Sequence, residues 1–301
     1  MSNAVSDTIA DFQVRAKAMR TEVEAALAAC TQYPADCPAK LGEAIRYSLL
    51  APGKRLRPLL VLMAAEACGQ DRGKAMPAAC AVEMIHTYSL IHDDLPAMDD
   101  DELRRGMPTC HIKFGEAVAI LAGDALLAQA FEVLATGIHP PDIASRCVAL
   151  LAQAAGPTAL VGGQADDLEW EFRGGQLADL EAIHRRKTGA LLNVSLILGG
   201  TVAVAGDEPL TALGTYGRKL GLAFQIVDDL LDLQGDAEKL GKKVGKDSSR
   251  GKLTFPGLLG AEESARRAAT LVDESIAALE MFGARAEPLR GLARYVLERN
   301  H

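Results

Sequence analysis

The sequence predicts an all-α protein, a single large helical bundle around a central cavity. Long stretches rich in Ala and Leu carry apolar residues at helical spacing, and both residue types favour the helix. We find no segment with the polar–apolar alternation of a half-buried strand bounded by turn residues. The chain also contains neither a Pro/Ser-rich linker nor a long-period repeat, so we expect one domain over residues 1–301.

Glycine and proline delimit the expected helices, because both residues interrupt helical patterns. Breaks stand at Pro52, Gly156, Gly174 and Gly206, and the polar segment Gly235–Gly251 reads as a loop. In chain order, we expect helices at 6–30, 40–51, 56–69, 74–94, 109–136, 142–155, 158–172, 176–205, 209–234, 253–282 and 286–299.

Composition restricts the classes of partner and the compartment. Apolar residues make up 49% of the chain, which is enough for a large core, and the formal net charge is −8. An acidic chain is a poor candidate for nucleic-acid binding, and it can bind anions only where basic residues gather and cations assist. Six cysteines without a C-x-x-C pair predict free thiols in a reducing cytosol. The first residues lack a basic start followed by an apolar run, so we expect a cytoplasmic protein without a secretory signal.

One segment, Gly189–Gly206, contains no charged residue. It includes polar residues and several glycines, whereas a membrane span needs about 20 mostly apolar residues. We therefore expect a buried helix and no membrane span.

The first acidic motif is I-H-D-D-L-P-A-M-D-D-D-E-L-R-R-G, from Ile91 to Gly106. It follows an apolar helical stretch and contains Pro96, which distorts a helix because proline lacks the backbone N–H. This distortion lets Asp93 and Asp99 converge although they are six residues apart. Either acidic motif alone could be an exposed helix end, but two on apolar helices favour a site for hard cations.

The second acidic motif is Q-I-V-D-D-L-L-D, from Gln225 to Asp232. Asp228 and Asp232 are four residues apart and therefore share one helix face. Their apolar neighbours predict a buried helix, in which unpaired carboxylates are costly. A bound divalent cation relieves that cost, and Mg²⁺ held in this way completes its shell with water and substrate phosphate.

Basic clusters suited to phosphate lie at several points of the chain. Three cations of Gly53–Pro58 precede an apolar helix, Arg104-Arg105 follows the first acidic motif, and Arg185–Lys187 opens the uncharged segment. Helix N-termini and arginine forks both bind phosphate oxygens. His86 precedes Asp93 by two helical turns and can donate a hydrogen bond to phosphate, or it can be a satisfied core histidine.

These motifs resemble those of the short-chain trans-prenyl diphosphate synthases, and the resemblance covers almost the whole chain. Two aspartate-rich motifs, the R-R-G after the first, the K-T-G, and G-K-L-T-F-P at Gly251–Pro256 occur in the family's order. The resemblance implies the isoprenoid synthase fold and a homodimer. It also implies a Mg²⁺-dependent, head-to-tail condensation of isopentenyl diphosphate with dimethylallyl or geranyl diphosphate.

The resemblance further implies roles for matching residues. Ligands of up to three Mg²⁺ ions are expected to be Asp93, Asp94 and Asp99 on one wall and Asp228, with Asp229 and Asp232, on the other. The expected allylic diphosphate clamp is Arg104, Lys187 and Lys242. The expected isopentenyl diphosphate clamp is Lys54, Arg57, His86 and Arg105. Thr188 and Gln225 are expected near the developing allylic cation, Gln164 and Asp167 along the cavity, and Lys252 over a diphosphate.

Product length is expected to depend on Tyr88 and Ser89, which precede Asp93 by five and four residues. An aromatic residue at the first of these positions, together with the longer spacing between the acids of the first motif, resembles bacterial farnesyl diphosphate synthases. Asp166 departs from the family, in which an apolar residue is frequent. It leaves every expected ligand in place.

Four alternatives remain. A geranyl or geranylgeranyl diphosphate synthase would share the fold, and a terpene cyclase would lack the isopentenyl clamp. A metal phosphohydrolase would need more placed histidines than the six present. A non-catalytic subunit of a heteromeric synthase would have lost some of the acidic or basic positions.

Overall fold

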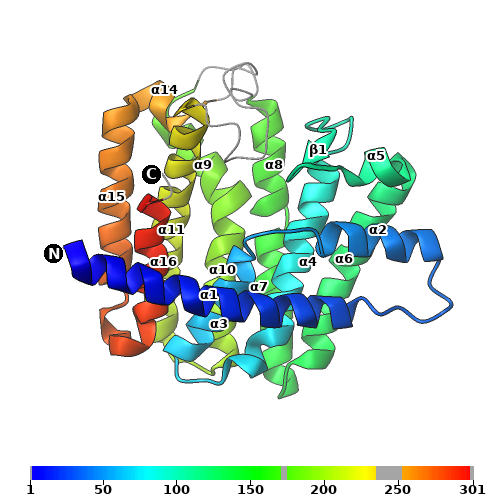
Figure 1. The fold of residues 1–301 in the computed structure, drawn as a ribbon, viewed down its shortest axis with the longest axis horizontal. Helices are drawn as coiled ribbons and strands as arrows, with labels where there is room; N and C mark the ends of the chain where they lie inside the picture. The colour runs from blue at the N-terminus through cyan, green and yellow to red at the C-terminus, as the bar shows by residue number, and fades with distance from the viewer. Residues whose placement is uncertain (1, 171–174, 235–252, 299–301) are drawn as a thin grey trace.

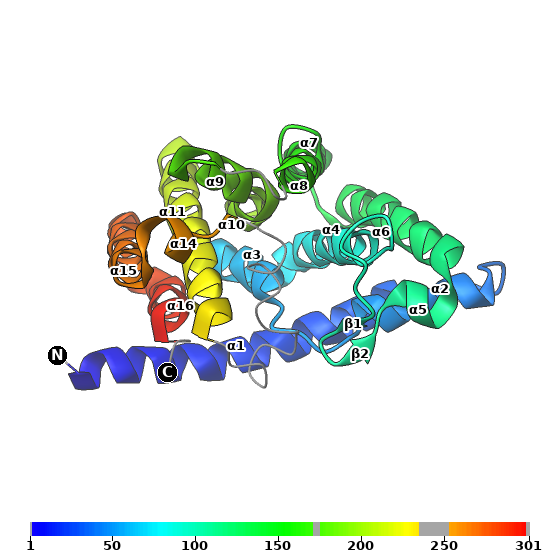
Figure 2. The same ribbon diagram turned by 90° about the horizontal axis from the view of Figure 1, so that it is seen from above.

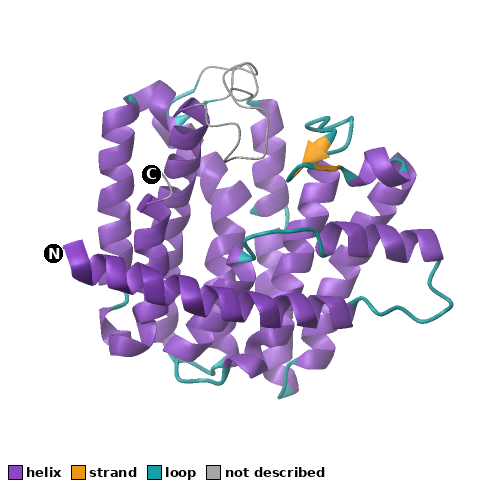
Figure 3. Cartoon of the chain, in the orientation of Figure 1, coloured by secondary structure: helices purple, strands orange, loops and turns teal. Residues whose placement is uncertain are grey.

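The computed structural model confirms the all-α class (Figure 3). It describes residues 2–170, 175–234 and 253–298. Within these ranges the chain is helical apart from loops and a hairpin that the sequence did not predict, formed by β1 (Leu103–Arg104) and β2 (Met107–Pro108). The long helices are α1 (Ser2–Cys30), α2 (Ala39–Leu49), α3 (Leu56–Ala67), α4 (Met76–Asp93), α6 (Glu116–Gly137), α7 (Pro141–Ala155), α8 (Leu160–Glu169), α10 (Ala190–Val202), α11 (Asp207–Gln234), α15 (Ala261–Ala277) and α16 (Glu287–Glu298). The short helices are η1 (Arg72–Ala75), α5 (Cys110–Phe114), α9 (Leu177–His184), η2 (Arg185–Gly189), α14 (Phe255–Leu259) and η3 (Glu280–Ala286).

Three helices, α3, α4 and α10, form the centre of the bundle. Figure 2 shows them between α11 and α15 on one side and α6 on the other. Every residue from Pro58 to Ala65 in α3 and from Ala78 to Ile85 in α4 is buried. A helix that is apolar on all sides belongs in a core, and the Ala-rich sequences of these helices let them approach closely. At Gly199 of α10, an added Cβ would lie 2.2 Å from the carbonyl oxygen of Val61 in α3.

Several expected helices are divided, and the divisions have local causes. The expected helix 109–136 breaks at Gly115, and the expected helix 253–282 breaks at Gly260, where φ is +91° and +82°. Only glycine adopts these values without strain. The expected helix 176–205 contains the π-helical turn η2, whose wider winding carries Lys187 and Thr188. Such turns occur frequently at functional sites.

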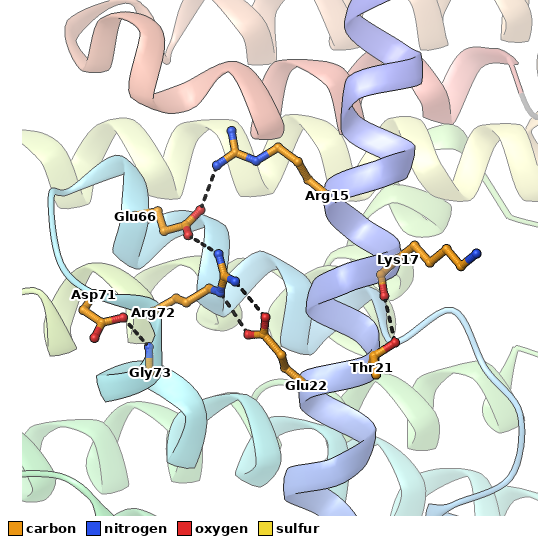
Figure 4. Close-up of polar contacts among 8 residues, drawn as sticks. All are labelled: Arg15, Lys17, Thr21, Glu22, Glu66, Asp71, Arg72 and Gly73. Carbon is orange, nitrogen blue, oxygen red and sulfur yellow. Dashed lines mark hydrogen bonds and ion pairs between the residues drawn. The ribbon is translucent and has the colours of Figure 1, made fainter.

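Helix α1 crosses one face of the bundle, as both views show (Figures 1 and 2). A charged cluster around Arg72 attaches it to the end of α3 (Figure 4). Arg72 donates to both carboxylate oxygens of Glu22 at 3.0 and 2.7 Å and to Glu66 at 2.9 Å. Glu66 also pairs with Arg15 at 3.6 Å. This cluster joins α1, α3 and η1 on the surface, away from the acidic motifs.

The uncharged segment expected to be a buried helix is α10, in which Leu191, Leu196 and Leu198 are fully buried. Among the described residues, Glu116–Gly137 and Pro141–Glu169 are long and apolar enough to cross a membrane, by length and composition only. Core helices of soluble proteins meet the same criterion, so these segments are weak evidence for a span.

Candidate active site

Both acidic motifs lie at the same end of the bundle, the upper end in Figure 1. Helix α4 ends there at Asp93, and α11 reaches it at its C-terminal end. Segments separated by more than a hundred residues thus meet at one edge.

After α4, the chain makes the distortion that Pro96 predicts. The backbone N–H of Asp99 donates to the carbonyl oxygen of Asp93 at 2.8 Å, and Asp101 donates to Asp94 at 3.2 Å. The turn therefore returns Asp99 to the side of Asp93, as the sequence predicted. Burial raises the pKa of Asp93 to about 6; the nearby Lys187 opposes this rise, and the Asp99 carboxylate adds to it.

The β1–β2 hairpin positions the arginine pair. Arg105 and Gly106 form its turn at φ +54° and +76°, which suits the right-handed twist of a two-residue hairpin. The turn directs Arg104 back to the first motif, where its Nε and Nη2 donate to the Asp94 carboxylate at 2.5–2.9 Å. Asp94 is buried and the Arg104 side chain is 25% exposed, so this is a partly buried, bidentate pair. The role of Asp94 as a metal ligand stays a prediction.

A basic cluster stands beside this hairpin. Arg105 donates to the carbonyl oxygen of Pro52 at 2.8 Å and covers Gly53, where an added Cβ would lie 2.4 Å from its Nη1. Burial and the neighbouring Arg105 lower the pKa of Arg57 to about 10, while the carboxylates of Glu83 and, less strongly, Asp228 oppose this shift. The hairpin therefore contacts the loop before α3, and the first turn of α3 lies near both the hairpin and the second acidic motif.

His86 belongs to the same basic cluster. Burial, followed by the charges of Arg57, Arg105 and other nearby arginines, lowers the pKa of His86 well below its ordinary value. The imidazole is therefore neutral near pH 7 and can donate one hydrogen bond without adding a charge. Together, the cluster suits a multiply charged anion.

The residue pair that supports this cluster, Arg55 and Glu83, was not predicted from the sequence. Arg55 occupies the left-handed region at φ +51° and caps α3, and its guanidinium donates to Glu83 at 2.9 Å and to Ala51 at 2.7 Å. Both side chains of the pair are at most 3% exposed. The sequence did contain a signal for this pair: Glu83 is the one acid in α4 before Asp93, and an acid within an apolar helix requires a partner.

Helix α8 and the π-helical turn η2 form the next wall. At Gly163, an added Cβ would lie 2.2 Å from the backbone nitrogen of Lys187, so only glycine permits this approach. Lys187 donates to Asp167 at 2.6 Å. Asp166, which departs from the expected pattern, forms an ion pair with Arg186. The Nε2 of Gln164 is buried and finds no hydrogen-bond partner among the described residues.

The second acidic motif occupies the last turns of α11. Asp229 is 6% exposed and accepts from the backbone N–H of Phe255 at 2.9 Å and from Gln225 at 3.2 Å. This carboxylate joins α11 to the start of α14. Asp228 and Asp232 lie one turn apart on α11, on the face that their spacing predicted.

The residues present fit the hard cation that the sequence analysis expects. The half-buried Asp93 carboxylate lies near Asp99, and burial together with the Asp99 charge raises its pKa, an effect that a bound cation would oppose. Oxygen ligands from one or two carboxylates, completed by water and phosphate, are what Mg²⁺ accepts. No preformed group of three or more acid, histidine or cysteine ligands occurs among the described residues, so the remaining ligands would come from substrate and water.

The structure thus groups the expected residues into a few contacts. Asp93 lies near Asp99, Arg104 and Lys187, while Arg57 lies near His86, Arg105 and Asp228. Tyr88 is buried at 6% exposure, and Ser89 donates to the carbonyl oxygen of His86 at 2.9 Å. The positions of Lys242 and Lys252 lie outside the described residues.

Comparison with known proteins agrees with this geometry. The polyprenyl synthetase family matches residues 38–281. The chain is 52% identical over 233 residues to a farnesyl diphosphate synthase of Geobacillus stearothermophilus, covering 75% of this chain and 78% of the relative. It is 46% identical over 271 residues to a geranylgeranyl diphosphate synthase of Cyanophora paradoxa, covering 89% of this chain and 90% of the relative. A crystal structure of an FPP/GFPP synthase from Zymomonas mobilis superimposes with a TM-score of 0.87 at 39% identity, covering 96% and 99% of the two chains. The chain therefore belongs to the polyprenyl synthetase family and is a prenyl transferase with the all-α isoprenoid synthase fold.

Proposed function

We propose that the protein condenses isopentenyl diphosphate with dimethylallyl and then geranyl diphosphate to give farnesyl diphosphate. The observation that carries this proposal is the juxtaposition of the half-buried Asp93 and Asp99 carboxylates with the basic cluster around Arg57, Arg105 and neutral His86. The acidic pair can bind one diphosphate through Mg²⁺, and the basic cluster can bind another directly. A single diphosphate would need only one of these two sites, so their presence at one edge favours two diphosphate substrates.

Mg²⁺ would be held by carboxylates of the two facing motifs. We assign Asp93, Asp99 and Asp228 as principal ligands, with Asp94 and Asp232 in support, for up to three ions. When bound, the metal neutralises diphosphate charge and makes the diphosphate a better leaving group.

The chain's own groups supply the remaining chemistry. Arg104 and Lys187 hold the allylic diphosphate and stabilise the negative charge that develops as the C–O bond breaks. Lys54, Arg57, His86 and Arg105 hold isopentenyl diphosphate so that its double bond faces the new allylic cation. The buried apolar residues beside the acidic motifs, among them Ile91 in α4 and Ile226 in α11, would exclude water, which would otherwise quench that cation.

Two polar groups stand beside the reacting carbons in this assignment. The carbonyl oxygen of Gln225 and the hydroxyl of Thr188 would face the positive charge, and the unpartnered Nε2 of Gln164 would meet a bound substrate. After the new C–C bond forms, a proton leaves the adjacent carbon. The departing diphosphate is the base that we propose, because its oxygens are able to accept a proton once the C–O bond has broken.

The fifteen-carbon product is the finer part of the proposal, since the relatives include both farnesyl and geranylgeranyl diphosphate synthases. Burial of the Tyr88 ring, five residues before Asp93 on α4, supports a short pocket. The alternatives are a geranyl or geranylgeranyl product and a non-catalytic subunit. Against the last, every described position of the expected clamps carries its acidic or basic residue.

We further propose a cytoplasmic homodimer. Helix α6 supports a dimer, because Ile120 is 44% and Leu121 55% exposed on a helix that also buries apolar residues against α4. Exposed apolar residues grouped on one helix are typical of interaction surfaces. Analytical ultracentrifugation of the purified protein tests this assignment.

The function is tested by a product assay. Purified protein receives isopentenyl diphosphate, Mg²⁺ and either dimethylallyl or geranyl diphosphate, and mass spectrometry reads the chain length. We expect a fifteen-carbon diphosphate that disappears on adding EDTA. Asp228→Asn should lower turnover by roughly 100-fold or more. Asp142→Asn, on the exposed start of α7, is the matched control and should leave turnover unchanged. A folded protein that forms no condensed product would refute the proposal.

A further inference from the structure

The side chain of His92 occupies the contact between α4 and α6. Its Nε2 lies 3.0 Å from the carbonyl oxygen of Ile120 in α6. A carbonyl only accepts, so this nitrogen carries the proton and donates. The space for the imidazole exists because residue 123 is glycine: an added Cβ at Gly123 would lie 2.1 Å from Nε2. The histidine ring is thus fixed to the neighbouring helix by a hydrogen bond and by a close fit.

The same ring contacts Tyr88, one helical turn earlier on α4. The two ring centroids are 5.8 Å apart, and the ring planes make an angle of 77°. This edge-to-face arrangement is the favoured geometry of an aromatic pair. Tyr88 is 6% exposed, and burial raises the pKa of its hydroxyl, so the tyrosine is a neutral, enclosed ring. His92 therefore fixes one side of the Tyr88 ring.

We propose that His92 is a positioning residue that sets product length by holding the Tyr88 ring in place, with Gly123 providing the room it needs. This inference rests on the proposed function, in which Tyr88 closes the pocket for the growing chain. A ring closes a pocket only while it is kept from turning aside. His92 performs this task because its own ring is packed against Gly123 of α6 and does not turn with Tyr88, while the hydrogen bond to Ile120 only adds to this fixation.

The consequence of losing the imidazole follows from the geometry. Gly123 has no side chain to fill the vacated space, so a gap opens directly beside the Tyr88 ring. The ring can then turn into this gap, and the pocket deepens between α4 and α6. A deeper pocket admits one more five-carbon unit, which shifts the product from fifteen to twenty carbons.

The test compares three variants that separate the ring from the hydrogen bond. His92→Ala and His92→Asn both remove the ring, whereas His92→Phe keeps a ring against Tyr88 and loses only the hydrogen bond. Each variant receives isopentenyl and geranyl diphosphates with Mg²⁺, and the ratio of twenty- to fifteen-carbon product is measured. His139→Ala, at an exposed position, is the control. We expect the ratio to rise by roughly three- to tenfold for Ala and Asn, the factor that an aromatic contact of this kind contributes. Phe should stay near the wild type.

A second measurement shows whether His92 acts through Tyr88. In a Tyr88→Ala background the ring to be positioned is absent, so adding His92→Ala should leave the product ratio unchanged. An additional rise in that background would overturn the inference. So would a wild-type ratio in the Ala and Asn variants, or complete inactivity of both as folded proteins. If only His92→Ala fails to fold, His92→Asn decides by the same criterion. A wild-type protein without any condensation refutes the proposed function itself, and the inference falls with it.

Discussion

Replacing Glu83 by glutamine should destabilise the protein strongly, although Glu83 lies outside every recognised motif. The Glu83 carboxylate meets Arg55 at 2.9 Å, with the two side chains 3% and 1% exposed. Removing one partner leaves the other as an unpaired buried charge. Buried pairs broken in this way lose about 3–5 kcal/mol, a large part of a typical domain's 5–15 kcal/mol.

The surroundings of the pair place Glu83→Gln within this range. Glutamine keeps the size of the side chain and can accept one hydrogen bond from Arg55, so no cavity forms. However, Arg55 stands in the left-handed region, and its guanidinium also donates to Ala51. The Arg55 side chain is therefore tied to a fixed backbone and is poorly placed to move towards water. Without Glu83, its charge also adds to those of Arg57 and Arg105.

The assay is equilibrium unfolding in guanidinium chloride at pH 7.5, followed by far-UV circular dichroism. Glu263→Gln is the matched control, because Glu263 pairs with Arg266 at 2.6 Å while the two side chains are 42% and 73% exposed. An exposed pair contributes at most about 1 kcal/mol. A loss below about 1 kcal/mol for Glu83→Gln, equal to that of the control, would refute this explanation.

A double replacement separates the charge from the packing. Arg55→Met combined with Glu83→Leu removes both charges and fills the same space, and such replacements of buried pairs are frequently neutral. We expect most of the lost stability to return. The KM for isopentenyl diphosphate should be raised in this variant, because Lys54 and the start of α3, which carries Arg57, would lack their ion-pair anchor. A normal KM in the folded double variant would show that the pair contributes only to stability.

Three further predictions concern pH, close packing and the surface cluster. The pKa of His86 is lowered in the folded state, so below pH 6.5 only the unfolded chain protonates this imidazole. The stability that the neutral imidazole contributes is therefore present above pH 6.5 and lost below it, by up to about 1.4 kcal/mol at pH 5.5. His86→Gln should flatten the curve of the unfolding midpoint against pH. Gly163→Ala should lower stability and raise the KM for geranyl diphosphate, since the new methyl group meets the backbone of Lys187, and a wild-type KM would contradict this. Arg72→Ala should cost about 1–2 kcal/mol by detaching α1 from α3, measured as a lower melting temperature with unchanged turnover per folded molecule.

Local rules predicted the parts of the site that local chemistry determines. Pro96 indicated a turn, and the backbone bond from Asp99 to Asp93 is that turn. The four-residue spacing placed Asp228 and Asp232 on one face of α11. In both cases the determining residues lie within one or two helical turns of each other, so no knowledge of the tertiary structure was needed.

Tertiary neighbours determine what the sequence left open. Arg55 and Glu83 are 28 residues apart, and nothing in either segment names the other as its partner. In the sequence, Gly123 and Gly163 do not differ from other glycines within helices. Only the structure shows that a side chain at Gly123 would meet His92 and that one at Gly163 would meet the backbone of Lys187. The short hairpin was missed because Arg105, unlike glycine, rarely adopts a positive φ, so the turn lacked its usual composition.

Carboxylates explain how an acidic chain assembles cations to receive anions. Arg104 is paired with Asp94, Lys187 with Asp167, and the charge of Arg57 is offset by Glu83 and, less strongly, by Asp228. Each of these cations comes from a different element than the acid that balances it. Only Arg104 and Asp94 are close in the sequence, because the hairpin directly follows the first acidic motif. Before substrate arrives, the pairs lower the repulsion between the cations and hold their side chains in position. A diphosphate then competes with carboxylates for donors that are already ordered, so binding costs less side-chain entropy than it would with mobile surface lysines.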